Sequence, residues 1–522
     1  MVARYKTLRE LIDLQAKFRT RQTYLITPET DQHMSYAQLQ THAQDFSQQL
    51  QQAGIEKGEK VAMLLDNGYW TVAIMLGAMY SGAVIVPMNA VAGASVLDYV
   101  LDHSDSRMLF ISPNYQGKYP ALVETAAAKM AVTVVDQASF ELNSSSDSDE
   151  TSQSGASFDH NSLAKINAED AAVLIYTSGT TGRPKGVQLS HKNVLAGAQN
   201  TAHAHQLSDT DRGLCVLPLY HINAEIVSVL GSLVSGGSLV LPPKFSVSSF
   251  WPLVAEEGCT WFSVVPTIVA YLLDHAEREG LSSELKNYIS TKVKFGRSAS
   301  APLSPEMHKE FEEKFSVSLI ETMGLTETAA QILSNPLPPG KIKYGSPGIA
   351  VGNEAKIIDD QGEECPRCVS GELMIRGDNV LSAYYKNEAA TKEAITADNW
   401  LHTGDLAMQD EEGYFFITGR LKELIIKGGE NISPREIDEV LFSHSAVLEA
   451  AAFAVDHREY GQEIMACVVL KQDMSVDCET IRAFAEKELG KFKAPQRIYI
   501  LDELPKGPSG KVQRLKLADL LT

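Results

Sequence analysis

A run of glycine, serine and threonine residues follows an apolar, strand-like segment in the first half of the chain. The run YTSGTTGRPKG spans Tyr176 to Gly186 and comes directly after the segment AAVLI. Glycines let the backbone turn tightly and approach a ligand, hydroxyl groups donate hydrogen bonds, and Lys185 supplies a positive charge. These residue types predict a cradle for a polyphosphate.

The spacing of this run excludes a Walker-type nucleotide loop. A Walker loop needs serine or threonine directly after the lysine, whereas here Pro184 precedes Lys185 and Gly186 follows it. A surface loop rich in serine and threonine is the alternative interpretation. We favour the phosphate loop because the run is long and follows a strand.

Further segments with polar residues of catalytic type follow in order. They are LPLYHINA with His221, GRSASAPL from Gly296 to Leu303, ETMGLTET with Thr326 and Glu327, LHTGDLA with Asp405, and GRLKELIIKGGENISP with Arg420. The last segment, LPKGPSGKVQRLK, contains Lys511 and no acidic residue. On a chain with a formal charge of −20, this basic segment suggests an anionic ligand.

Together these segments resemble the adenylate-forming superfamily, which includes acyl-CoA synthetases, luciferases and the adenylation domains of peptide synthetases. They span residues 176 to 516, and the N-terminal third is similar to the opening subdomain of that family. The resemblance implies that a carboxylic acid is adenylated by ATP and that its acyl group then passes to CoA. It therefore implies ATP, Mg²⁺ and CoA as cofactors.

The resemblance also assigns individual roles. The expected phosphate contacts are Thr177, Ser178, Gly179, Thr180, Thr181, Gly182, Lys185 and Thr326. The expected contacts to adenine, acyl group, ribose and Mg²⁺ are Ser300, Ala301, Pro302, Thr322, Met323, Asp405, Arg420 and Glu327. Many relatives have an aromatic residue that stacks on adenine where this chain has Met323.

For catalysis, the resemblance implies that Lys511 bridges the carboxylate and the α-phosphate, so that no side-chain nucleophile is needed. The C-terminal domain then rotates about Lys422, and Gly428 and Gly429 let the pantetheine arm pass close to the backbone. Lys427 is a further expected cofactor-binding residue. A carrier-loading adenylation enzyme, a non-catalytic paralogue and a luciferase-like oxygenase are the alternative functions.

The acid is left open by the sequence. The candidate pocket residues are His221, Val265, Gly296, Arg297 and Met323. A buried Arg297 would call for a second carboxylate, and RSASAPL with the downstream NPLP resembles the oxalate-activating branch. If Arg297 instead points outward to a surface acid, the pocket is apolar and takes a fatty or aromatic acid. We favour the apolar pocket, because most ligand pockets are mainly hydrophobic.

Alternating strand-like and helical patterns must position these residues. They predict an α/β fold: a large N-terminal acyl- and ATP-binding domain with stacked sheets over residues 1–420, and a small mobile α+β domain over residues 421–522. The polar, acidic segment at residues 141–157 predicts a surface loop. A capping box from Ser433 to Glu436 predicts the start of a helix.

Composition excludes several other classes of protein. The charge of −20 argues against nucleic acid as a partner, and no apolar segment predicts a signal peptide or membrane span. We therefore expect a cytoplasmic protein; the sequence does not indicate its oligomeric state. Six cysteines without a framework spacing suggest free thiols, and Cys365 and Cys368 are predicted to lie in a hairpin turn rather than in a metal site.

Overall fold

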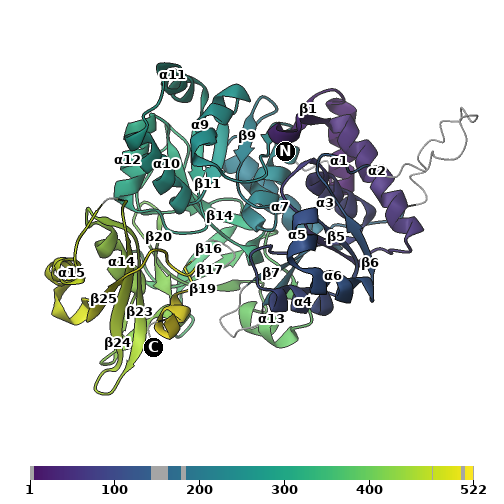
Figure 1. The fold of residues 1–522 in the computed structure, drawn as a ribbon. Helices are drawn as coiled ribbons and strands as arrows, with labels where there is room; N and C mark the ends of the chain where they lie inside the picture. The colour runs from purple at the N-terminus through teal and green to yellow at the C-terminus, as the bar shows by residue number, and fades with distance from the viewer. Residues whose placement is uncertain (1–4, 143–162, 178–183, 473, 507–511, 521–522) are drawn as a thin grey trace, which may run out of the picture.

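A computed structural model describes residues 5–142, 163–177, 184–472, 474–506 and 512–520. Its described part contains two large sheets, a four-stranded sheet and a separate C-terminal sheet (Figure 1). The predicted α/β fold with a large domain of stacked sheets and a small α+β domain is confirmed. None of the described helices is long and apolar enough to cross a membrane.

The first large sheet contains the β-α-β units that the sequence predicted. Its strands run in the order β18 (Ala383–Tyr384), β8 (Lys185–Ser190), β7 (Ala171–Thr177), β4 (Val84–Pro87), β3 (Lys60–Leu64), β5 (Ser106–Ile111) and β6 (Ala131–Val134). β3 and β4 are parallel, with Val61 opposite Ile85, because helix α3 (Tyr69–Ser81) carries the chain back between them.

The second large sheet positions the residues downstream of the phosphate loop. Its order is β15 (Ile349–Ala350), β14 (Ala330–Ser334), β13 (Leu319–Leu325), β12 (Phe295–Ser298), β11 (Trp261–Val264), β9 (Arg212–Cys215), β10 (Ser238–Val240), β1 (Thr23–Thr27) and β2 (Gln32–Ser35). The strands from β13 through β1 in this order are parallel to one another. Their carboxyl ends therefore lie at one edge, where open α/β sheets bind ligands.

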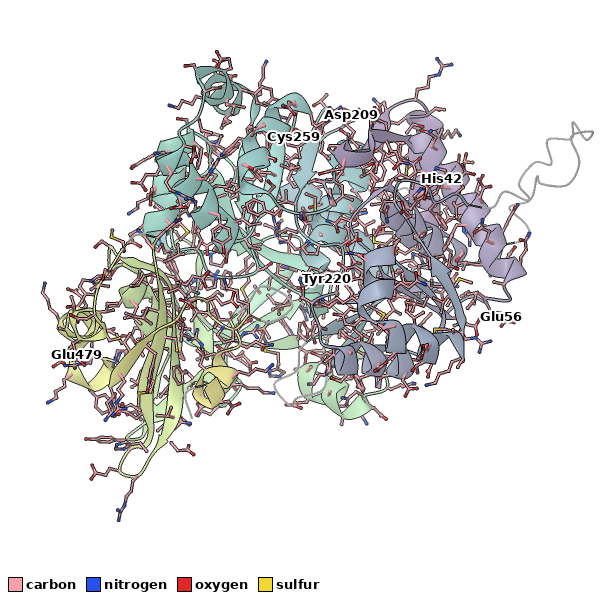
Figure 2. The ribbon with its side chains drawn as sticks, in the orientation of Figure 1. His42, Glu56, Asp209, Tyr220, Cys259 and Glu479 are labelled. Atoms are coloured by element: carbon pink, nitrogen blue, oxygen red, sulfur yellow. The ribbon has the colours of Figure 1, made fainter. Side chains whose placement is uncertain are left out.

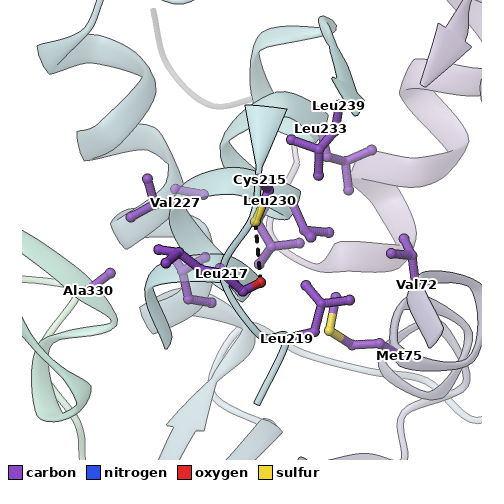
Figure 3. Close-up of a cluster of buried hydrophobic side chains, with 14 of the residues drawn as sticks. Val72, Met75, Cys215, Leu217, Leu219, Val227, Leu230, Leu233, Leu239 and Ala330 are labelled. Carbon is purple, nitrogen blue, oxygen red and sulfur yellow. Dashed lines mark hydrogen bonds between the residues drawn. The ribbon is translucent and has the colours of Figure 1, made fainter. Parts of the chain in front are cut away.

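Helix α3 packs between the two large sheets. It contacts β4 of the first sheet and β1 and β2 of the second. Nearly all of its side chains are buried, as expected for a helix that is apolar all round. Val72 and Met75 of α3 face Leu219 and the buried side chains around β9, as Figure 3 shows, so the core is continuous across the interface.

A four-stranded antiparallel sheet links the large domain to the C-terminal part. Its strands are β16 (Glu354–Ile358), β17 (Gly371–Arg376), β19 (Leu401–Gln409) and β20 (Phe415–Arg420). Cys365 and Cys368 lie in the connection between β16 and β17, and both thiols are free, as predicted. No group of metal-ligating side chains occurs in the described part of the chain.

The C-terminal sheet is formed only by residues after Leu424. It contains β22 (Glu430–Ile432), β21 (Ile425–Lys427), β24 (Gly461–Leu470), β23 (Val447–His457) and β25 (Arg497–Ile500), and helices α14 (Pro434–Phe442) and α15 (Cys478–Lys493) pack with it. These elements form the yellow-green body at the lower left of Figure 1. The boundary between residues 420 and 421 stays a prediction.

The predicted capping box at the start of α14 is wrong. The side chain of Ser433 makes no cap hydrogen bond and instead donates to the carbonyl oxygen of Thr418 on β20, at 2.5 Å. A tertiary contact has replaced the local one, and it fastens α14 to the strand that enters the C-terminal domain. Most of the predicted acidic loop at 141–157 lies outside the described residues.

Candidate active site

Candidate residues on β11, β12 and β13 meet at the carboxyl edge of the second large sheet. Ser263, Arg297 and Ile320 are register partners on β11, β12 and β13, and the next residues on these strands also pair. Val265, the loop after Ser298 and Thr322 follow directly at the same edge. Parallel pairing therefore gathers candidate residues that are separated by dozens of positions in the sequence.

The phosphate-loop candidate lies in the chain between the paired strands β7 and β8. Thr177 ends β7 and Lys185 begins β8, and the two residues are register partners. The expected contacts Ser178, Gly179, Thr180, Thr181 and Gly182 lie outside the described residues. The hairpin thus positions the two ends of the loop side by side at the strand ends.

Lys185 and Glu327 are connected through Tyr384. The Lys185 ammonium lies 5.0 Å from the centre of the Tyr384 ring, and the Tyr384 hydroxyl donates a hydrogen bond of 3.0 Å to Oε1 of Glu327. Glu327 lies in the short helix η4 (Thr326–Thr328) directly after β13. Burial and the Glu327 carboxylate both raise the pKa of Tyr384, so the phenol remains a hydrogen-bond donor.

Asp405 and Arg420 form a cross-strand ion pair. They are register partners on β19 and β20, and Arg420 Nε lies 2.6 Å from Oδ1 of Asp405. Asp405 is 3% exposed, whereas the Arg420 side chain is 41% exposed. The Asp405 carboxylate raises the pKa of Arg420, so the guanidinium is charged at neutral pH and the contact is a charge-assisted hydrogen bond.

The small-residue loop after β12 has an unusual backbone. Ser300 has φ of +73°, a left-handed conformation that is uncommon for residues other than glycine. Ala301 and Pro302 beside it are exposed. This conformation turns the backbone of the loop outward at the edge where the strands end.

Thr322 and Met323 lie next to this loop on β13. The Thr322 hydroxyl donates to the carbonyl oxygen of Ser298 at 3.4 Å, so it ties β13 to the end of β12. Met323 is half-buried against the core and pairs with Leu333 on β14.

Arg297 is a buried cation. It is 2% exposed, and it donates from Nη1 to Asn223 Oδ1 at 2.7 Å and to Ser263 Oγ at 3.1 Å, and from Nε to Gln331 Oε1 at 3.2 Å. All three acceptors are uncharged. Within the described residues, no carboxylate lies within 4.0 Å of its guanidinium. Burial lowers the pKa of Arg297 to about 9, which leaves it charged at neutral pH.

The Nη2 atom of Arg297 is the part of the guanidinium that remains available. It has no hydrogen-bond partner among the described residues, and it keeps some accessible surface. Two N–H groups therefore remain for a ligand at the sheet edge.

The other pocket candidates, His221, Val265 and Gly296, differ in their surroundings. His221 is half-buried beside Tyr220, with ring centres 4.6 Å apart, and Tyr220 is labelled near the centre of Figure 2. Val265 precedes helix α10 (Pro266–Arg278) and is half-buried. A side chain at Gly296 would meet the Phe262 ring at 2.3 Å. Gly296 therefore serves close packing between strands on the face opposite Arg297.

The C-terminal candidates include a tight turn. Gly428 and Gly429 have φ of +59° and +87° and connect β21 to β22 as a two-residue hairpin loop, which explains the need for glycine at both positions. Lys422 lies in the short helix η5 (Leu421–Glu423), before this hairpin.

Lys427 is used inside the C-terminal domain. It is 5% exposed, and its ammonium lies 2.5 Å from Glu463 and 2.8 Å from the carbonyl oxygen of Phe492. The resemblance predicts that Lys427 contacts a cofactor, but in this arrangement its charge is already paired. A buried pair of this kind orients the strand rather than a ligand.

Lys511 lies outside the described residues, but ion pairs anchor the segments on either side. Lys506 pairs with Glu449 at 2.6 Å. Arg514 pairs with Asp438 at 2.6 Å and with Glu423 of η5 at 3.4 Å. The basic segment is thus attached to the C-terminal sheet on one side and to η5 on the other.

Sequence reasoning missed Tyr384, Asn223 and Gln331. Gln331 is a polar residue in the mainly apolar run AAQILS, and such a residue needs a partner when it is buried. Asn223 stands between His221 and Glu225 in HINAEIV and gave no comparable signal. Tyr384 gave no such signal, because a tyrosine in a strand-like segment is ordinary.

Comparisons with known proteins agree with this arrangement. The model of the AMP-binding enzyme family matches residues 12–385, and the model of the AMP-binding enzyme C-terminal domain matches residues 436–511. The chain is 42% identical to sulfoacetate–CoA ligase of Cupriavidus necator, over 98% of this chain and 97% of that one. It is 37% identical to oxalate–CoA ligase of Arabidopsis thaliana, over 88% of both chains. The structure of ATP-bound MatB from Rhodopseudomonas palustris is similar with a TM-score of 0.84 and 27% identity, over 98% of both chains.

Proposed function

The chain belongs to the AMP-binding enzyme family, and from this premise we propose which acid it activates. It is an ATP-dependent acid–thiol ligase, which converts a carboxylic acid to the acyl-adenylate and then transfers the acyl group to CoA with release of AMP. We propose that its acid is small and carries a second acidic group, a sulfonate or a carboxylate, opposite the carboxylate that reacts.

The buried charge of Arg297 carries this proposal. A guanidinium that is 2% exposed and has only neutral partners costs free energy unless an anion offsets the lost hydration. Its Nη2 atom has two N–H donors left, and an oxygen of a carboxylate or sulfonate can accept a charge-assisted hydrogen bond from it. An aliphatic or aromatic tail would leave both the charge and these donors unsatisfied.

This position of Arg297 changes the preference drawn from the sequence. The apolar-pocket interpretation assumed that Arg297 points outward to a surface acid, and that assumption is wrong because the side chain is buried without an acidic partner in the described residues. Sulfoacetate and oxalate, the acids in the names of two relatives, each carry a second acidic group. Their chemistry supports the same proposal.

In the first half-reaction, a carboxylate oxygen attacks the α-phosphate of ATP and pyrophosphate leaves. We assign Lys185, Thr326 and the residues between β7 and β8 to the phosphates, and Lys511 to the charge that develops between carboxylate and α-phosphate. Asp405 accepts the ribose hydroxyls, and Arg420 holds Asp405 in place. Positioning and charge neutralisation are sufficient, because the substrate carboxylate is already ionised at neutral pH.

Glu327 fits the role of a Mg²⁺ ligand. The Tyr384 hydroxyl orients its carboxylate through Oε1, and Mg²⁺ prefers one or two carboxylates together with phosphate oxygens and water. When bound there, the ion supplies positive charge to the phosphates.

In the second half-reaction, the CoA thiol attacks the acyl-adenylate carbonyl. We assign Lys422 as the hinge, and the Gly428–Gly429 turn as the backbone that the pantetheine arm passes. A cytoplasmic location stays a prediction.

The test compares acids in ATP–pyrophosphate exchange. Sulfoacetate, oxalate and malonate are measured beside propionate, octanoate and benzoate, with the unaltered chain and with Arg297→Met. We expect exchange with at least one acid of the first group, and a loss of about tenfold or more in Arg297→Met, because a charged hydrogen-bond partner is removed.

Arg212→Met is the matched control. Arg212 is a half-buried arginine at the start of β9, and so at the amino edge of the second large sheet, whereas Arg297 lies near the carboxyl edge. It donates hydrogen bonds to Ser238 Oγ and to the carbonyl oxygen of Glu257. Its replacement should leave the choice of acid unchanged. Exchange that is best with octanoate or benzoate and insensitive to Arg297→Met would contradict the proposal.

A further inference from the structure

The partners of Arg297 are all neutral, although a carboxylate would stabilise a buried guanidinium better. Asn223, Ser263 and Gln331 accept its three internal hydrogen bonds at 2.7, 3.1 and 3.2 Å. Two of the three acceptors are carboxamides, and each has a carboxylate counterpart of nearly the same shape. The choice of amides therefore leaves the guanidinium charge uncompensated by the described protein.

Both the oxygen and the nitrogen of the Asn223 carboxamide form hydrogen bonds. Oδ1 accepts from Arg297 at 2.7 Å and from Ser263 at 3.3 Å, while Nδ2 donates to Ser300 Oγ at 3.4 Å. Asn223 is 6% exposed and begins the π-helix η3 (Asn223–Leu230), a helix type that occurs often at functional sites. Its side chain thus connects the Arg297 guanidinium to the loop with the left-handed Ser300.

Gln331 is a second neutral acceptor for the Arg297 guanidinium. Its Oε1 accepts from Arg297 at 3.2 Å and from Nε2 of His205 at 3.1 Å. Burial and the nearby guanidinium lower the pKa of His205 to about 3, so the imidazole is neutral at physiological pH. With both donors on Oε1, the amide oxygen of Gln331 is held toward Arg297.

We infer that Asn223 is a positioning residue that determines specificity. As a neutral hydrogen-bond acceptor it orients Arg297 without offsetting the guanidinium charge, which stays available for the second acidic group of the substrate. The inference rests on the proposed function and deepens it. Aspartate at this position would keep the shape and the Arg297 contact but would supply the counter-charge from the protein. The second acidic group of the substrate would then meet an ion pair instead of an uncompensated guanidinium. The attraction would be lost, and the added carboxylate would repel the substrate anion.

The experiment uses Asn223→Asp in the full-length protein, with Gln331→Glu as a second variant of the same kind. For the acid with the best exchange, we expect KM to rise by about tenfold or more while KM for ATP changes little. The melting temperature should stay unchanged or rise, because the variant pairs a buried charge. A merely structural asparagine would give the opposite pattern, with lowered stability and a parallel loss for both substrates.

Each outcome decides the inference. If Asn223→Asp unfolds, or leaves KM for the acid unchanged, the inference is wrong. If Arg297→Met raises KM for the acid and Asn223→Asp does not, only the role of Asn223 is overturned. If Arg297→Met also has no effect, the proposed second acidic group is wrong as well, so the two failures are distinguishable.

Discussion

The hydroxyl of Tyr384 donates a hydrogen bond of 3.0 Å to Oε1 of Glu327. This contact joins two strands of the first large sheet to the end of β13 in the second, because Tyr384 lies on β18 beside β8, while Glu327 follows β13. The phosphate-loop hairpin and the candidate Mg²⁺ carboxylate are thereby held in one arrangement.

Loss of this hydroxyl should weaken nucleotide activation. A hydrogen bond to a charged group contributes about 1.5–3 kcal/mol, so Tyr384→Phe is expected to slow ATP–pyrophosphate exchange by about tenfold at limiting Mg²⁺. Tyr385→Phe is the control, since that hydroxyl contacts Asp105 at 2.8 Å. Equal exchange rates in the two variants would show that Tyr384 does not orient Glu327.

The Gly428–Gly429 turn should matter for the thiol step only. Gly429→Ala places a side chain at φ of +87° where no atom lies within 4 Å, so its cost is backbone strain of about 1–2 kcal/mol. We expect slower CoA-dependent AMP release with unchanged ATP–pyrophosphate exchange. Gly280→Ala imposes similar strain at φ of +72° far from the turn, and it should alter neither step.

Lys511 should separate the two half-reactions. The resemblance to the family predicts that Lys511→Ala abolishes adenylation but preserves thioester formation from a supplied acyl-adenylate. Lys516→Ala, an exposed lysine in the same basic segment, serves as the control and should retain both steps. Separate assays of each step on purified variants measure the difference, and equal loss of both steps in Lys511→Ala would contradict the assignment.

Asp211 should contribute to stability in a pH-dependent way. Burial acts to raise its pKa, but the Lys294 ammonium at 2.6 Å and hydrogen bonds from Ser208 and Thr260 outweigh burial and lower it. Because the folded-state pKa is depressed, the stabilisation is present above the unfolded pKa of about 3.9 and is lost as pH falls through the folded value.

Asp211→Asn should therefore lower the free energy of unfolding at pH 7 by about 2 kcal/mol. Chemical denaturation at pH 7 and at progressively lower pH measures the difference between the two proteins, which should shrink at the acidic end. A difference that is independent of pH would show that packing, and not the carboxylate charge, is responsible.

Local features of the sequence were sufficient for much of the fold. The alternation of strand-like and helical patterns predicted the α/β fold, and the parallel strands β3 and β4 with helix α3 between them belong to it. This prediction succeeds because the periodicity of a strand or a helix depends on neighbouring residues. The ordered segments likewise indicated the family, since each is short and contiguous.

The direction of individual side chains required the tertiary structure. On β21, Ile426 is 52% exposed and Lys427 is 5% exposed, the reverse of the usual pattern, because Glu463 on β24 pairs with the lysine. At Ser433, a contact with Thr418 replaced the predicted cap. In both cases a partner distant in sequence outweighed the local preference.

The site proposed for the acid shows most clearly what the sequence determines and what the tertiary structure decides. The sequence alone determined that the chain has the segments of an acid-activating enzyme and that Arg297 lies among them. Only the tertiary structure decided that this guanidinium is buried among Asn223, Ser263 and Gln331, which come from three different elements. The charge and hydration of a side chain depend on everything packed around it, and those neighbours are brought together by the sheet rather than by the order of the chain.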